Sequence, residues 1–86
     1  MKQFTYVITD SLGIHARPAG LLAKEARKYP DTEITVSRDG ETVRAVQLMK
    51  LMAMGLKQGD CVTVCAQGAS EAEAIGAMQR FFEENL

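Results

Sequence analysis

The chain passes from strand to helix at residues 13–20, which read Gly13-Ile14-His15-Ala16-Arg17-Pro18-Ala19-Gly20. A proline suits the first turn of a helix, because its missing N–H sacrifices no hydrogen bond there and its fixed φ fits the helical backbone. Pro18 therefore predicts a helix that begins at about Ala16, with His15 at or beside the N-cap. His15 is the only histidine among the 86 residues.

The first residues of this helix have the chemistry of an anion site. The backbone N–H groups of Ala16 and Arg17 have no helical partner, and the positive end of the helix dipole lies there too. The Arg17 guanidinium adds a fork of donors that suits a phosphate. The His15 imidazole is a nucleophile near neutral pH, where much of it is unprotonated. The combination suits covalent phosphorylation of His15, although a lone histidine at a helix start is more often a cap or a surface residue.

Four segments have the alternation and the composition of β-strands, namely Phe4–Ile8, Glu33–Ser37, Glu41–Arg44 and Cys61–Ala66. Their apolar faces are formed by Phe4, Tyr6, Ile8, Ile34, Val36, Val62, Val64 and Ala66. Asp39-Gly40 is a strong hairpin signal between the second and third strands. The short third strand is expected at an edge of the sheet.

Two helices have clear apolar stripes. In the helix from about Ala16 to Lys28, the side predicted to meet the sheet consists of Ala19, Leu22, Ala23 and Ala26. The opposite, mainly basic side consists of Arg17, Gly20, Leu21, Lys24, Arg27 and Lys28. Ser70 and Glu73 predict a capping box at the start of the last helix, which runs toward residue 84. The buried stripe predicted for that helix is Ala72, Ile75, Met78 and Phe82.

The segment Val46–Gly55 predicts a helix that is apolar around most of its circumference, with only Gln47 and Lys50 polar. Such a helix is either buried or partly exposed as a contact surface, and its composition favours neither alternative. Its methionines would suit a surface that accepts differently shaped partners.

Composition excludes several classes of protein. The net charge of −1 gives no indication of nucleic-acid binding. No apolar run approaches the roughly 20 residues of a membrane span, and no signal-peptide pattern is present, so we expect a cytoplasmic protein. Cys61 and Cys65 would lie about 13 Å apart on one strand, too far for an intrachain disulfide. Two cysteines and one distant histidine also fall short of a zinc site, and no motif calls for a metal or a cofactor.

The order of the elements, β-α-β-β-α-β-α, predicts an α+β fold. We expect an open-faced sandwich, in which a four-stranded antiparallel sheet carries three helices on one face. Residues 1–86 contain no linker and no internal repeat, and they are expected to form a single domain.

The string Gly-Ile-His-Ala-Arg-Pro-Ala at residues 13–19 closely resembles the phosphorylation-site signature of the HPr family. These proteins are the histidine phosphocarriers of the bacterial phosphoenolpyruvate:sugar phosphotransferase system, and the similarity covers nearly the whole chain. The resemblance implies the same sandwich fold. It also implies that enzyme I donates phosphate from phosphoenolpyruvate to Nδ1 of His15 and that the chain passes it to the A domains of sugar-specific enzymes II during sugar uptake. The chain would be a carrier and not an enzyme, and nothing in the sequence requires more than a monomer.

The same resemblance implies a partner-binding face around His15. From the first helix it would comprise Arg17, Gly20, Leu21, Lys24 and Arg27, and from the second helix Leu48, Met49 and Met52. Leu51 and Met54 are expected to turn inward. Gram-positive members carry a regulatory serine near the start of the second helix. Here Gln47 aligns with that serine and cannot accept a phosphoryl group, so serine-linked regulation is not expected.

Two other functions stay open. One is a regulatory HPr-like protein that binds a transcription factor or an enzyme, although the intact His15 and the Gln47 position weigh against it. The other is a ferredoxin-like module for RNA or a small ligand, with a similar order of elements. An RNA-binding sheet would need exposed aromatic residues and a basic surface. The chain has only two tyrosines and three phenylalanines, most of them predicted to face inward.

Overall fold

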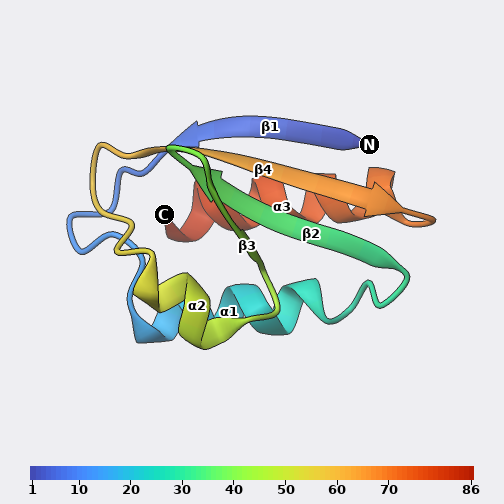
Figure 1. Cartoon of the computed structure of the whole chain (residues 1–86), viewed down its shortest axis with the longest axis horizontal. Helices are drawn as coiled ribbons and strands as arrows, with labels where there is room; N and C mark the ends of the chain where they lie inside the picture. The colour runs from blue at the N-terminus through green and yellow to red at the C-terminus, as the bar shows by residue number, and fades with distance from the viewer.

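The computed structural model describes all 86 residues. The elements are β1 (Lys2–Val7), α1 (Ala16–Ala26), β2 (Thr32–Arg38), β3 (Glu41–Arg44), α2 (Leu48–Ala53), β4 (Cys61–Gly68) and α3 (Glu71–Asn85). Their order is the predicted one (Figure 1). The second helix is shorter than predicted, with six residues, and Gln47 is its N-cap.

The four strands form one antiparallel sheet in the order β1-β4-β2-β3, so β1 and β3 are its edges. The predicted hairpin joins β2 to β3. Arg38 pairs with Glu41, and the two residues between them have positive φ, 51° at Asp39 and 83° at Gly40. A two-residue turn with both φ positive matches the twist of the strands that it connects.

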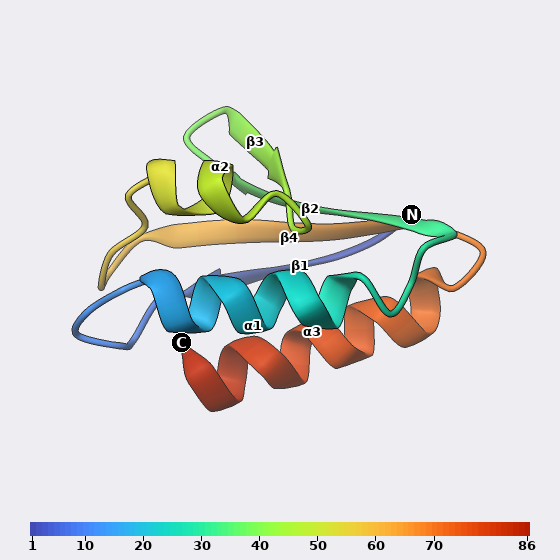
Figure 2. The same ribbon diagram turned by 90° about the horizontal axis from the view of Figure 1, so that it is seen from below.

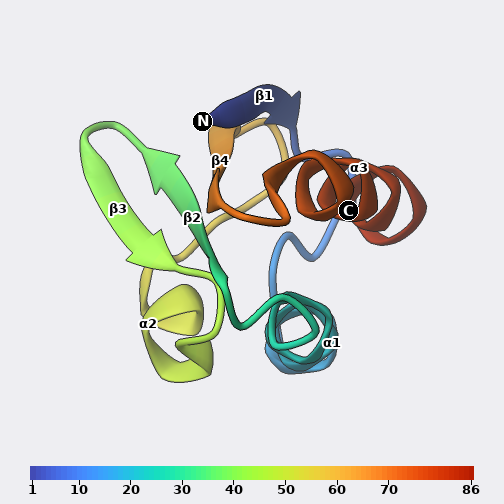
Figure 3. The ribbon, with the colours of Figure 1, turned by 90° about the vertical axis from the view of Figure 1, so that its right-hand side faces the viewer.

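All three helices lie on the same side of the twisted sheet (Figure 3). Helices α1 and α3 run side by side along it, and α2 packs between α1 and β3 (Figure 2). The side of α1 that was predicted to be buried is buried. No helix has the length and apolar character needed to span a membrane.

Phe82 of α3 lies at the centre of the aromatic packing. Its ring meets Phe4 and Tyr6 of β1 edge to face, with centroids 5.8 and 5.6 Å apart, and Phe81 at 6.2 Å. Such pairs stabilise a core beyond the area that they bury. Tyr29 also packs against the core. Because every aromatic side chain packs on the helical side of the sheet, the structure gives no support to an RNA-binding sheet.

The stripe predicted for α3 was wrong at its start. Ala72 is exposed and Ile75 is only partly buried, whereas the buried residues are Ala74, Ala77, Met78, Phe81 and Phe82. Helix α3 packs against α1 as well as against β1 and β4. Because α3 contacts a helix as well as the sheet, its buried surface is wider than a stripe facing the sheet alone and extends toward α1.

The predicted capping box was also wrong. Ser70 is the N-cap of α3, but its side chain makes no cap hydrogen bond. Its hydroxyl donates to Asp31 Oδ2 at 3.1 Å, and its amide donates to Thr32 Oγ1 at 2.9 Å. Polar side chains of Asp31, before β2, and Thr32, its first residue, therefore hold the start of α3 in place of Glu73.

Candidate functional site

His15 is the N-cap of α1, as predicted. Its backbone is extended, with φ −129° and ψ −173°, and its carbonyl accepts the first helical hydrogen bond from the amide of Ala19 at 2.9 Å. Its imidazole makes no cap hydrogen bond and is partly exposed. The backbone of His15 is therefore fixed, while its side chain takes no part in the cap.

The loop before His15 packs closely against the connection between α2 and β4. The amide of Ile14 donates to the Leu56 carbonyl at 3.0 Å, and the Ile14 side chain is buried. Gly13 has φ +64°, and a Cβ atom there would lie 2.3 Å from the Leu56 oxygen. Only glycine fits both this conformation and this close approach. The backbone that presents His15 is thus fixed on its N-terminal side.

Two amide donors at the start of α1 are free. No hydrogen bond engages the N–H groups of Ala16 or Arg17, and both residues are exposed. The Arg17 guanidinium forms no ion pair. Unpartnered amides at the positive end of a helix dipole, with a guanidinium beside them, form a suitable setting for a phosphate.

A shallow hollow of about 230 Å³ brings His15 and Arg17 together with residues from two other segments. Its lining is Asp10, His15, Arg17, Pro18, Leu21, Glu84 and Asn85. The sequence pattern gave no signal for Glu84 or Asn85, because they reach the hollow from the far end of the chain. Two carboxylates therefore share the hollow with one guanidinium.

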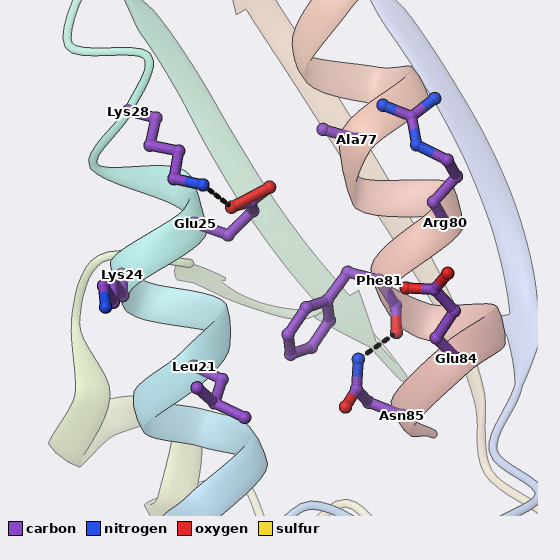
Figure 4. Close-up of a pocket in the computed structure, with 9 residues that line it drawn as sticks. All are labelled: Leu21, Lys24, Glu25, Lys28, Ala77, Arg80, Phe81, Glu84 and Asn85. Carbon is purple, nitrogen blue, oxygen red and sulfur yellow. Dashed lines mark hydrogen bonds and ion pairs between the residues drawn. The ribbon is translucent and has the colours of Figure 1, made fainter.

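A second hollow of about 360 Å³ continues the first between α1 and α3 (Figure 4). It shares Leu21, Glu84 and Asn85 with the first hollow, and the Phe81 ring points into the space between the two helices. Lys28 and Glu25 at its far end form an ion pair of 2.8 Å. The hydrogen bond from Lys28 to Glu25 raises the pKa of the lysine. This larger hollow does not contain His15.

Apart from Gly20 and Leu48, the residues predicted for a partner-binding face are exposed, and the two helices that carry them, α1 and α2, are in contact. On α1, Gly20 is partly exposed and Leu21, Lys24 and Arg27 are exposed. On α2, Met49 is 76% and Met52 39% exposed, whereas Leu48 packs partly against the core. Leu51 and Met54 are buried, as predicted. Exposed apolar side chains on two neighbouring helices are typical of an interaction surface.

Leu12, in the loop before His15, extends this set of exposed apolar residues at 71% exposure. Gln47 is the N-cap of α2, without a side-chain cap hydrogen bond.

Comparison with known proteins gives consistent matches over the full chain. The family model described as "PTS HPr component phosphorylation site" matches residues 2–84. The phosphocarrier protein HPr of Mycoplasma genitalium is 40% identical over 85 residues, covering 99% of this chain and 97% of the relative.

Solved structures agree with these matches. The histidine-containing phosphocarrier protein of a mycoplasma superposes with a TM-score of 0.92 at 36% identity, covering 96% of this chain and 93% of its own. HPr of Thermoanaerobacter tengcongensis gives a TM-score of 0.91 at 38% identity, covering 98% and 93%. On this evidence of sequence and fold together, the chain belongs to the HPr family, the phosphocarrier proteins of the phosphotransferase system.

Proposed function

We propose that His15 carries the phosphoryl group, accepting it at Nδ1 from enzyme I and passing it to the A domains of sugar-specific enzymes II. The phosphoryl group would originate in phosphoenolpyruvate. One observation carries the proposal, namely a partly exposed imidazole at the N-cap of α1, beside two free amides and the unpaired Arg17. Residues 1–86 would form a single phosphocarrier domain, and its partners would supply further catalytic groups.

The transfer step requires the Nδ1 lone pair to be free and the ring proton to be on Nε2. The N–P bond forms as the bond between phosphorus and the donor atom breaks, and the reverse sequence on the acceptor releases the imidazole. The amides of Ala16 and Arg17 and the Arg17 guanidinium would stabilise the transferred charge. Asp10 and Glu84 line the same hollow, and their negative charge opposes that of the phosphate. This opposition favours onward transfer over storage.

Both partners would use one docking face around His15. We assign to it Arg17, Gly20, Leu21, Lys24 and Arg27 of α1 together with Leu48, Met49 and Met52 of α2. An apolar centre with basic residues around it fits a partner surface whose apolar patch is bordered by carboxylates.

We propose that the carrier acts as a monomer, because donor and acceptor would each need this face uncovered. A solved HPr of Thermoanaerobacter tengcongensis is described as a dimer. The oligomeric state should therefore be measured by size exclusion in the assay buffer.

Incubation with phosphoenolpyruvate and enzyme I tests the proposal. Intact mass should show the gain of one phosphoryl group, and mild acid should remove it. His15→Ala should gain none while its thermal unfolding stays that of the parent chain. Addition of an enzyme II A domain should then discharge the carrier. Equal phosphorylation of His15→Ala would refute the assignment of the site, and a carrier that charges but never discharges would favour a regulatory protein.

A further inference from the structure

The side chain of Arg38, at the end of β2, contacts the connection between α2 and β4, 16 to 22 positions away in sequence. Its Nη2 donates to the Met54 carbonyl at 2.6 Å, and its Nη1 donates to the Gly55 carbonyl at 3.1 Å. Nη1 also donates to Asp60 Oδ2 at 2.8 Å. Arg38 therefore connects the sheet to the C-terminal end of α2 and to the turn before β4.

Helix α2 is poorly supported by its own residues. It has six residues, and its N-cap residue Gln47 supplies no side-chain hydrogen bond. Helices shorter than about 12–15 residues are marginal in water, and the last carbonyls of any helix lack helical partners. The guanidinium supplies donors for two carbonyls at this end. Its positive charge also lies where the helix dipole is negative.

Asp60 holds the guanidinium in place. The same oxygen that accepts from Arg38 accepts from the amide of Lys57 at 3.0 Å. The Lys57 amide and the Arg38 guanidinium lower the pKa of Asp60, so the carboxylate stays charged opposite Arg38. The two other carboxylates near Arg38, on Asp39 and Glu41, lie 4.0 Å away.

The Nε atom of Arg38 is buried without a hydrogen-bond partner. An unsatisfied buried donor is destabilising. The two Nη atoms of the guanidinium thus contact Met54, Gly55 and Asp60, while Nε is left without a hydrogen-bond partner. This orientation indicates that the contacts with the end of α2 determine where the side chain lies.

We propose that Arg38 is a positioning residue for partner docking, which fixes α2 against the sheet so that the exposed Met49 and Met52 are presented to the partner. The inference rests on the proposed function of α2 as part of the docking face. Arg38 acts through the main chain of α2 and touches neither the partner nor the phosphate. Its loss should therefore weaken docking and leave the chemistry at His15 unchanged.

The test is the kinetics of phosphorylation by enzyme I, with the carrier as the varied substrate. Arg38→Met keeps an apolar stem but removes every donor. It should raise KM by up to about tenfold while kcat is unchanged, since loss of a hydrogen bond to a charged group can lower the population of correctly placed α2 by about this factor. Arg38→Lys should restore part of the loss, because one ammonium can donate to a carbonyl and to Asp60. Amide hydrogen exchange should accelerate over residues 48–55 and stay unchanged in β4.

Arg44→Met is the matched control. It removes a guanidinium from the same hairpin, but Arg44 is exposed and has only a loose contact of 3.9 Å with Glu33. Its KM and its exchange over residues 48–55 should equal those of the parent chain. An equal rise in KM for both variants would assign the effect to net charge and overturn the proposal.

Met49→Ala distinguishes the role of α2 in docking from the role of Arg38 in positioning α2. If it leaves KM unchanged, α2 is not part of the docking face and that part of the proposed function fails. If it raises KM while Arg38→Met does not, the docking face stands and the role of Arg38 is overturned. Should Arg38→Met not fold, Asp60→Asn replaces it, with a rise in KM of about two- to threefold and faster exchange at residues 54–57. Unchanged KM in Asp60→Asn would then overturn the proposal.

Discussion

Thr9 and Leu86 are joined by two hydrogen bonds across 77 residues of sequence: the Leu86 main-chain oxygen accepts from the Thr9 amide at 2.6 Å and from the Thr9 hydroxyl at 3.0 Å. The amide of Asp10 donates to the same oxygen at 2.8 Å. The end of α3 thus holds the loop that leads to His15, and the Leu86 side chain is only 3% exposed.

Leu86→Ala should therefore lower the free energy of unfolding by about 2–3 kcal/mol, the lower part of the range for buried leucines. The main-chain hydrogen bonds would remain, so the loss measures the packing of the side chain. Urea denaturation gives the value, with the exposed Glu83→Ala as a control expected within about 0.5 kcal/mol of the parent chain. A loss no larger than that of the control would show that Leu86 contributes no packing.

Gly13 and Gly20 offer a contrast within one segment. Alanine at Gly13 would be left-handed and would place its Cβ 2.3 Å from the Leu56 oxygen, so Gly13→Ala should cost about 3 kcal/mol. Gly20 lies inside α1 with open space around it, so Gly20→Ala should stabilise the fold by up to about 1 kcal/mol. Thermal denaturation of the two variants should move in opposite directions, and a shared direction would contradict the geometry.

Arg17→Ala should slow phosphoryl transfer about 10- to 100-fold without loss of stability, because an exposed donor to the transferred charge is removed. Stopped-flow transfer from enzyme I, with circular dichroism in parallel, measures both quantities. Arg44→Ala removes the same charge from β3 and should transfer at the parent rate. A normal rate in Arg17→Ala, or its unfolding, would count against the proposed role.

The stability of the fold should depend more on the side chain of Thr32, the first residue of β2, than on that of Ser70 at the N-cap of α3. Thr32 is buried, and its hydroxyl donates to Asp31 at 3.1 Å and accepts from the Ser70 amide at 2.9 Å. Thr32→Val should therefore cost about 1–3 kcal/mol, since it leaves the Ser70 amide without a partner. Ser70→Ala removes only an exposed hydrogen bond and should cost about 0.5 kcal/mol. The reverse order in chemical denaturation would restore the capping interpretation for Ser70.

Stability should fall in acid partly through Asp60. Its pKa in the folded protein lies below its usual value of 3.8, first because of the Lys57 amide and then because of Arg38. A group with a lowered pKa contributes stability that is complete above the unfolded pKa and disappears as the pH falls through the folded one. Asp60→Asn should therefore be less stable than the parent chain at about pH 5, and the two should converge as the pH falls through the lowered pKa of Asp60. Urea midpoints across this range measure the difference, and parallel curves would contradict it.

Much of the fold could be predicted because local patterns and tertiary contacts agree. The apolar residues of α1 recur with the 3.6-residue period of a helix and so define a single buried face. Asp39-Gly40 favours a turn with positive φ at both residues, and the structure has such a turn. The stripe of α3 could not be predicted in the same way. Its neighbours include α1, and no local period indicates whether Ala72 or Ala74 faces a second helix.

The residues of the candidate site also differ in whether the local sequence predicts them. His15, Ala16 and Arg17 are adjacent in sequence, so the N-terminus of α1 could be predicted from local chemistry. Asp10 and Glu84 reach the hollow through tertiary structure, and Arg38 lies 16 and 17 positions from the carbonyls to which it donates. A charged side chain near a hairpin turn has the pattern of any solvated surface residue, and only its position beside α2 distinguishes it.

The hydrogen bonds from Thr9 and Asp10 to Leu86 also decide where an affinity tag belongs. A peptide fused after Leu86 would begin beside the hollow that contains His15 and would compete with partner proteins for access to it. The N-terminus lies at the opposite end of β1 (Figure 1), where a fusion would disturb only a surface ion pair of 2.9 Å between the Met1 ammonium and Glu71. Transfer assays should therefore use N-terminally tagged or untagged protein.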